Sequence, residues 1–319
     1  MNNHHPKKVR VGISSCLLGQ EVRYDGGHKN NPYIVKTLGE YFELVPFCPE
    51  VASGMSTPRP PIQLRETEQG VRCVGVKDHQ LDVTDQLQHC VSQQDHWLAS
   101  LCGYILKKDS PSCGMERVKV YKDDYPNRSG TGILAHYIQE HFPLLPMEEE
   151  GRLGDPHLRE NFIQRVYVMQ RWRNLNAEGQ LNVHNLTVFH SQHKLIAMSH
   201  DQHLAHDLGR LAASARKHNL NEVAEQYGLE LMACLKKTAT RGNHVNVLQH
   251  MQGYLSTKLD KEDKTELIDS IENYRQGYLP LIVPITLLRH HFRKMPDPFI
   301  NRSFYMSPHP EELAALNNI

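Results

Sequence analysis

The signals for β-strands stop halfway along this chain, and this break limits its fold more than any other feature. Up to about residue 150, short β-branched runs alternate with helical patterns and with turns rich in Gly and Pro. The runs that read as strands cover residues 9–14, 44–48, 71–76 and 104–107, with helical patterns over 31–41 and 83–101. Such alternation is typical of an α/β domain with a mainly parallel, Rossmann-like sheet.

Helical patterns alone follow this first half. They cover residues 186–216, 220–237, 243–259 and 265–274, and a last one runs from Pro284 to about Met295. Asp155 and Pro156 fit the N-cap and first residue of a helix that ends near Leu175 and bridges the two halves. We therefore predict an α/β domain over residues 1–155, a bridging helix within 156–180 and an all-α domain over 181–319.

Charge and hydropathy limit the possible partners. The 319 residues hold 36 Lys+Arg and 36 Asp+Glu, so the net charge is zero, which excludes polybasic, histone-like binding. The charge is −3 up to Glu150 and +3 after it, so the second half is the better candidate for contact with a polyanion, although chance explains so small a step equally well. No apolar run is long enough for a membrane span and no signal peptide is visible. We expect a cytoplasmic protein with no membrane partner and no obligate protein partner.

Three of the seven cysteines follow predicted strands. Cys16 comes after the first strand, Cys48 after the second and Cys113 after a later one, each beside Gly or Pro. Because parallel strands end at one edge of a sheet, the three thiols could converge there. Three thiolates suit a zinc ion or an iron–sulfur cluster. Their gaps of 32 and 65 residues match no standard ligand motif, so spacing alone favours buried core thiols.

The segments around these cysteines carry a resemblance. CLLGQEVRYDGGHK, CPEVASGMSTPRPP and LKKDSPSCG together resemble the thiouracil desulfidase family of iron–sulfur enzymes. In the second half, FHSQHKLIAMSH, RGNHVNVLQHMQGYLSTKL and IENYRQGYLPLIVPITLLRHH resemble a helical, YbgA-like family of long-unknown function. The fusion of the two resembles the two-domain bacterial tRNA 4-thiouridine desulfidases.

This resemblance implies a cofactor, a reaction and a partner. The implied cofactor is a [4Fe-4S] cluster held by Cys16, Cys48 and Cys113, with one iron left without a protein ligand. That iron would bind the thiocarbonyl sulfur while water attacks the ring carbon, with no net electron transfer. The implied partner is tRNA that carries 4-thiouridine. Two alternatives stay open: desulfidation of free thiouracil or thionucleosides, and a non-catalytic iron–sulfur module that binds RNA or acts as a sensor.

Four polar residues close to these cysteines are candidates for catalysis. Glu50, two residues after Cys48, is the first choice for a general acid or base, and its structural alternative is a helix N-terminal carboxylate. Ser112 could donate to the ring carbonyl or to a cluster sulfide, and Ser110 is its rival. Asp25, in the YDGG turn, either orients the water or forms an Asx-turn.

Three further features are ambiguous from sequence. Arg59 and Lys107 either face a phosphate or the base, or pair with surface carboxylates. Gly130-Thr131-Gly132, before a helix that starts near Ile133, resembles a short phosphate-cradling loop, but the pattern is too short to count alone.

The helical half carries two basic groups that suit a phosphate backbone. The first group is Arg289, His290, His291, Arg293 and Lys294, and the second is Lys236, Lys237, Arg241 and His244. The alternative is a pair of solvated helix ends whose positive charges favour the helix dipole.

Overall fold

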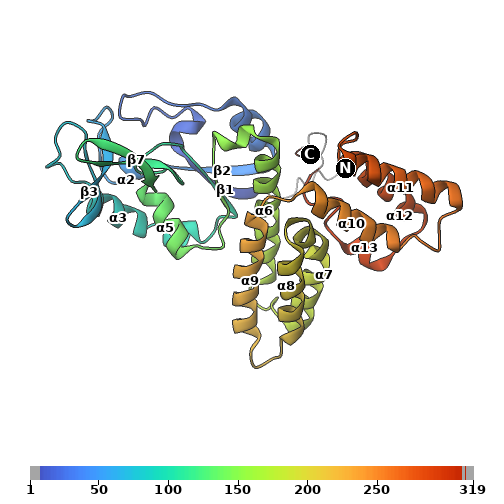
Figure 1. Ribbon diagram of the computed structural model, residues 1–319. Helices are drawn as coiled ribbons and strands as arrows, with labels where there is room; N and C mark the ends of the chain where they lie inside the picture. Colours follow the sequence, from blue (N-terminus) through green and yellow to red (C-terminus); the bar gives the residue numbers. More distant parts are fainter. Residues whose placement is uncertain (1–7, 311–312, 314–319) are drawn as a thin grey trace, which may run out of the picture. The chain divides into compact units, whose positions relative to one another are not determined.

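A computed structural model describes residues 8–310 and 313. The chain divides into two compact units, with the boundary in the sequence between Gly154 and Asp155 (Figure 1). The first unit is α/β and the second is helical, as predicted. Helix α6 (Pro156–Leu175) opens the second unit and packs there against α7 (Val183–His200) and α9 (Leu220–Lys236). Asp155 caps α6 as predicted, since its Oδ1 accepts hydrogen bonds from the backbone N–H of His157 at 2.8 Å and of Leu158 at 3.1 Å.

The first unit is built on a four-stranded parallel sheet. The strands run in the order β2-β1-β5-β8, which are Phe42–Phe47, Val9–Ser14, Gly103–Leu106 and Met147–Glu149. The inner strands β1 and β5 are buried along nearly their whole length, as in parallel sheets whose two faces are both covered. The carboxyl ends of β2, β1 and β5 are neighbours at one edge of this sheet.

A second sheet of four strands does not follow from the strand patterns of the sequence. Its order is β4-β3-β6-β7, which are Gly70–Gly75, Ile62–Thr67, Val118–Lys122 and Tyr125–Gly130. The strand predicted at residues 71–76 is β4, and it pairs with β3 in an antiparallel hairpin instead of joining the parallel sheet. The two-residue connection from Thr67 to Gly70, with Gly70 at φ +95°, permits only an antiparallel return.

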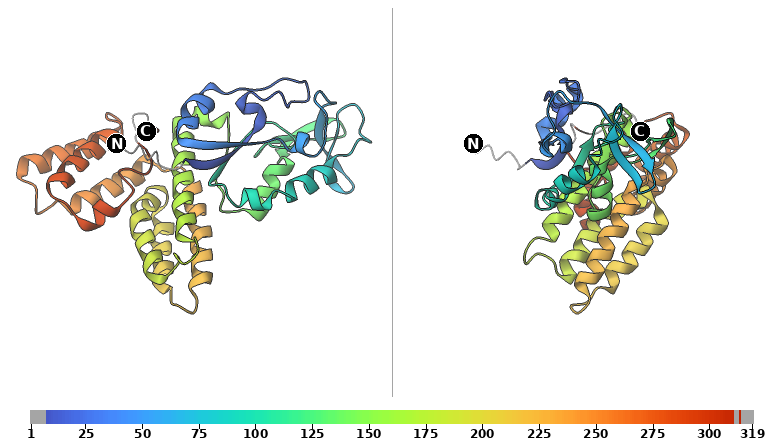
Figure 2. Two further views of the ribbon diagram at one scale, coloured as in Figure 1. Left: turned by 180° about the vertical axis from the view of Figure 1, so that it is seen from behind. Right: turned by 90° about the vertical axis from the view of Figure 1, so that its left-hand side faces the viewer.

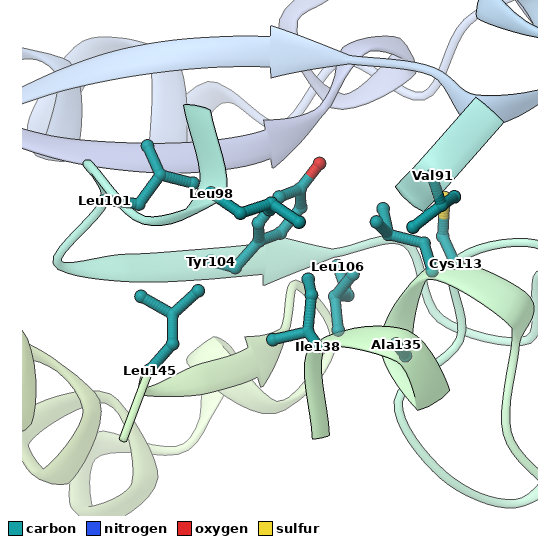
Figure 3. Packing of buried hydrophobic residues seen from close by; sticks show 10 residues of the cluster. Val91, Leu98, Leu101, Tyr104, Leu106, Cys113, Ala135, Ile138 and Leu145 are labelled. Atoms are coloured by element: carbon teal, nitrogen blue, oxygen red, sulfur yellow. The ribbon is translucent and has the colours of Figure 1, made fainter. Parts of the chain in front are cut away.

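The helices of the first unit cover the sheets and close its core. They are η1 (Ser15–Leu18), η2 (Tyr33–Leu38), α1 (Gly39–Tyr41), α2 (Pro49–Ala52), α3 (Thr84–Ser92), α4 (Asp95–Leu98), α5 (Ile133–His141) and η3 (Arg152–Gly154). The single helix predicted over residues 83–101 is therefore two helices, α3 and α4. Helices α3 and α5 pack against each other (Figure 2), and their apolar residues meet β5 in the core shown in Figure 3.

The second unit continues with helices, and its described residues from 155 to 310 contain no strand. They are α7 (Val183–His200), α8 (Gln202–Ser214), α9 (Leu220–Lys236), α10 (Arg241–Gly253), α11 (Lys261–Gln276), α12 (Ile282–Lys294) and α13 (Pro298–Arg302). The helix predicted over 186–216 is broken at Asp201, whose extended backbone ends α7 and whose carboxylate caps α8. In the part of the chain that is described, no helix is long and apolar enough to cross a membrane.

Candidate active site

The three cysteines that follow strands come together at the edge of the parallel sheet. Cys16 lies in η1 directly after β1, Cys48 directly follows β2, and Cys113 lies in the loop after β5. All three line one cavity of about 450 Å³. Because β2, β1 and β5 are adjacent and parallel, their carboxyl ends bring the three loops together despite the long sequence separations.

Burial of these thiols favours their neutral form. Burial, together with neighbouring Cys48, raises the pKa of Cys16 to about 11. Burial also raises the pKa of Cys48 and of Cys113. A thiolate in this site therefore needs a positive centre such as a metal to compensate its charge. Among the described residues, no three His, Cys, Asp or Glu side chains surround a point suited to a single metal ion.

Glu50 enters the same cavity from the first turn of α2 and is held by Arg59. The Arg59 Nε and Nη2 atoms both donate to Glu50 Oε2, at 2.8 and 2.6 Å. The pair is buried, with 12% of the Glu50 side chain and 5% of the Arg59 side chain exposed. One of the two interpretations of Arg59 from the sequence was an ion pair with a surface carboxylate. Arg59 does pair with a carboxylate, but that carboxylate lies in the cavity and not on the surface.

Both candidate serines belong to one hydrogen-bonded chain that ends on Glu50. Ser112 Oγ lies 2.5 Å from Glu50 Oε1, and an ionised carboxylate can only accept, so Ser112 donates. Ser110 Oγ lies 3.0 Å from Ser112 Oγ and accepts the backbone N–H of Cys113 at 3.1 Å. The hydroxyl protons thus point from Ser110 to Ser112 to Glu50. Ser112 contacts the carboxylate directly, whereas Ser110 acts through it.

Asp25 does not belong to this cavity. Its side chain is exposed, its Oδ1 accepts the backbone N–H of Gly27 at 3.0 Å, and it pairs with Arg23 at 3.3 Å. The Gly27 N–H lowers the pKa of this carboxyl, since it stabilises the charged form. Of the two interpretations of Asp25, the structure shows the Asx-turn, and the role of orienting water is corrected because the carboxylate bonds within its own turn.

Two glutamates hold the loop that carries Cys113: Glu149, the last residue of β8, and Glu150, directly after it. In the sequence this stretch appeared only as a break. Glu150 accepts hydrogen bonds from Lys107 Nζ and from the backbone N–H of Lys108 at 2.7 Å, at the start of the loop. Glu149 Oε1 accepts the backbone N–H of Met115 at 2.9 Å, just past Cys113. No sequence signal could have found these contacts, because each joins segments more than thirty residues apart.

Ser14 and Gly132 also shape this loop. Ser14 Oγ accepts the backbone N–H of Lys107 at 3.0 Å. One sequence signal could have found Ser14: it is a hydroxyl residue at the end of a predicted strand, two residues before the candidate ligand Cys16. A Cβ added at Gly132 would lie 2.7 Å from the backbone nitrogens of Cys113 and Gly114. Glycine at position 132 is therefore explained by this close approach of two backbone segments.

The basic groups of the helical unit divide into engaged and exposed side chains. His291 is 2% exposed, so its prediction as an RNA-binding residue is corrected: the ring lies inside the unit. Arg289 donates to the backbone oxygen of Met306 and to Ser307 Oγ, so its guanidinium holds the segment after α13.

The second basic group is also partly used within the unit. Arg241 donates to the backbone oxygen of Tyr274 and lies 4.7 Å from that ring's centroid. Lys237 pairs with Asp201 at 2.6 Å, and His244 is buried. The remaining candidates are exposed, and they are Lys236, His290, Arg293 and Lys294.

Comparison with known proteins gives this site its class. Residues 11–150 match the family model described as 2-thiouracil desulfurase, so the first unit is an enzyme domain of the desulfidase class. Residues 194–310 match a second model, DUF1722, described as a protein of unknown function. The chain belongs to the 2-thiouracil desulfurase family through its first unit and joins that domain to a DUF1722 domain.

Relatives match about half of the chain. The uncharacterized protein YbgA of Escherichia coli K12 is 29% identical over 147 residues, which are 46% of this chain and 86% of that protein. The uncharacterized protein YbbK of Bacillus subtilis 168 is 28% identical over 137 residues, 40% of this chain and 88% of that protein. A solved structure, titled [4Fe-4S]-dependent thiouracil desulfidase TudS, is 31% identical, covers 46% of this chain and 94% of that chain, and has a TM-score of 0.39.

Proposed function

We propose that the first unit removes the sulfur of 4-thiouridine in tRNA and leaves uridine. The observation that carries this proposal is the Glu50–Ser112 hydrogen bond inside the cavity that three cysteines line, in a domain of the desulfurase family. The reaction converts C=S and water into C=O and hydrogen sulfide. Water supplies the oxygen and both protons, so no external oxidant or reductant is needed.

The donor set suits an iron–sulfur cofactor. Cys16, Cys48 and Cys113 would hold a [4Fe-4S] cluster, because soft thiolates favour iron–sulfur centres and the buried thiols need a positive centre to ionise. With three protein ligands, the bound cluster would supply an open, thiophilic Lewis acid for the substrate sulfur.

The chain's own residues would manage the protons. Arg59 occupies Glu50 Oε2, so Oε1 is the oxygen that can take a proton from the attacking water. Ser112 already donates to Oε1 and keeps that oxygen oriented. The same carboxyl can then return the proton to the departing sulfur. The Ser110 hydroxyl is hydrogen-bonded to Ser112 Oγ and so helps to orient the Ser112 hydroxyl toward Glu50.

The cavity suits a nucleotide. A volume of about 450 Å³ lies in the range of sites that bind small molecules. Free thiouracil and thionucleosides would also fit this volume. Two exposed cationic side chains that line the cavity, Lys29 and Lys108, favour a substrate that carries phosphate.

We propose that the helical unit binds the RNA through exposed cations. Arg293 and Arg302 line a groove of about 580 Å³ on this unit, together with Phe292 and Phe304. Cations along a groove suit a phosphate backbone. Lys294 is exposed directly after Arg293 at the end of α12.

The test of the reaction is anaerobic purification, iron and sulfide analysis, and incubation with thiolated tRNA, 4-thiouridine or 4-thiouracil, followed by nucleoside mass spectrometry. We expect iron-loaded protein that converts the tRNA fastest. Cys16→Ala, Cys48→Ala and Cys113→Ala should each lose the iron, whereas Cys90→Ala should keep it. Conversion of the free base alone would move the substrate assignment to the first alternative, and a bound cluster without conversion of any substrate would leave the non-catalytic module.

The test of the RNA surface is the salt dependence of tRNA binding. In a plot of the logarithm of the tRNA binding constant against the logarithm of the salt concentration, replacing Arg293 and Lys294 by Ala should make the slope less steep. The slope should change by up to about 0.9 for each duplex phosphate that these side chains neutralise in the wild type. Turnover of free 4-thiouracil should stay unchanged. Lys217→Ala, at an exposed site outside this groove, is the matched control. An unchanged slope in the double variant places the RNA elsewhere.

A further inference from the structure

Tyr24 presents an exposed aromatic ring at the cavity that the three cysteines line. Among the described residues, two aromatic side chains line this cavity, Tyr24 and Phe47. Phe47 packs against Trp97 in the core of the first unit, with the ring centroids 5.4 Å apart. Tyr24 is 42% exposed and is the more exposed of the two. Because aromatic side chains are typical of the lining of small-molecule sites, the ring of Tyr24 is the one with surface left for a ligand.

The segment that carries Tyr24 is held by Arg59, the partner of Glu50. The backbone N–H of Arg59 donates to the backbone oxygen of Tyr24 at 2.9 Å. The Arg59 Nη2 atom donates to the backbone oxygen of Val22, also at 2.9 Å. The same guanidinium binds Glu50 Oε2. One arginine therefore fixes the backbone at Tyr24 relative to the carboxylate in the cavity.

Arg23 covers one face of the Tyr24 ring. Its guanidinium carbon lies over the ring, 5.4 Å from the centroid, which is within the range of a cation–π contact. Asp25 pairs with Arg23 at 3.3 Å and so helps to keep the guanidinium in this place. Since one face of the ring is occupied, a flat ligand would stack on the other.

We propose that Tyr24 stacks on the pyrimidine ring of the substrate and holds it beside Glu50. This inference rests on the proposed function, because it takes the thiopyrimidine of that reaction as the occupant of the cavity. Every base has a π-face, so the contact is available to a free base and to a base in RNA alike. Stacking is present in the bound substrate as well as in the transition state, so it should set affinity and not the rate of the chemical step.

The test compares Tyr24→Leu, which keeps an apolar side chain but has no π-face, with Tyr24→Phe, which keeps the ring. In anaerobically purified protein, isothermal titration with uracil measures binding of a pyrimidine without turnover. Tyr24→Leu should bind uracil about 5–150-fold more weakly, as expected for the loss of one stacked base. Its KM for 4-thiouracil should rise in parallel, with kcat and iron content unchanged.

The controls separate the ring from other effects of substitution. Tyr24→Phe should bind uracil as the wild type does, because the aromatic face remains. Tyr125→Leu, at an 80% exposed tyrosine of the same unit that does not line the cavity, should also behave as the wild type.

Three outcomes would overturn the inference. Equal affinity for uracil in the wild type and Tyr24→Leu would show that no base stacks on this ring. An equal loss in Tyr24→Phe and Tyr24→Leu would assign the effect to the hydroxyl. A wild type that does not bind uracil would exclude a pyrimidine from the cavity. A wild type that binds uracil but converts no thiolated substrate would instead refute the proposed function, so the two failures are distinguishable.

Discussion

Arg59 binds Glu50 through one carboxylate oxygen only: its Nε and Nη2 both reach Oε2, at 2.8 and 2.6 Å. The other oxygen, Oε1, is left to Ser112. One arginine thus orients the carboxylate and reserves its second oxygen for the cavity. Because the two carboxylate oxygens have different partners, substitution of Glu50 should affect activity and substitution of Arg59 should affect stability.

Glu50→Gln should keep the bound iron and lose most of the desulfidase activity. Glutamine preserves the size of the side chain but cannot take a proton from water, and general acid–base groups contribute about 10²–10⁴-fold. The measurement is kcat with thiolated tRNA beside the iron content. Glu68→Gln, at an exposed position of the same unit, should behave as wild type. Full turnover by Glu50→Gln would leave this residue with a structural role alone.

Arg59→Met should destabilise the first unit strongly, because it leaves the Glu50 carboxylate buried without its cation. Loss of one partner of a buried pair costs about 3–5 kcal/mol. The double variant Arg59→Met, Glu50→Gln should recover part of this loss, since no unpaired charge remains. Urea denaturation of metal-free protein measures both free energies of unfolding. If the double variant is no more stable than Arg59→Met, the ion pair is not what Arg59 contributes.

Gly132→Ala should displace the loop that carries Cys113. The new Cβ would lie 2.7 Å from two backbone nitrogens, which cannot yield as a flexible side chain would. We expect a loss of about 1–3 kcal/mol of stability together with reduced iron occupancy. Gly154→Ala, where an added Cβ meets nothing within 4 Å, is the control. Normal iron content in a destabilised Gly132→Ala protein would separate this glycine from the site.

The helical unit should lose stability as the pH falls. Burial lowers the pKa of His193 and His244 to about 3 and that of His200 to about 4. The unfolded chain takes up these protons near pH 6.5, whereas the folded unit does not, so stability is present above pH 6.5 and is lost toward pH 4. Each such histidine adds about 1.4 kcal/mol per pH unit within this window.

Denaturation followed by circular dichroism at pH 7, 6 and 5 measures this effect. His200→Gln should reduce the pH slope by about one proton, whatever it does to the stability at pH 7. His206→Gln, at a ring that is 72% exposed, should leave the slope unchanged. A free energy of unfolding that stays constant between pH 7 and 5 would contradict the buried, neutral state of these rings.

The sequence by itself determined the features that depend on near neighbours along the chain. The Asp155 cap of α6 is local, because a capping side chain bonds to N–H groups two and three residues away. The placement of Cys16 and Cys48 just after strands is also local, and parallel topology then carries both to one sheet edge. The same reasoning missed the break at Asp201, where a capping residue interrupts an apolar pattern that continues through it.

Tertiary structure alone decided the partners of the site residues. Glu50 and Ser112 are 62 residues apart, and Lys107 and Glu150 are 43 apart, so no periodic pattern links them. The burial of His291 inside a run that reads as a basic patch depends on which face of α12 packs inward. Such contacts exist because packing and burial bring distant segments together, and the free energy that selects them is not encoded in any short stretch of the chain.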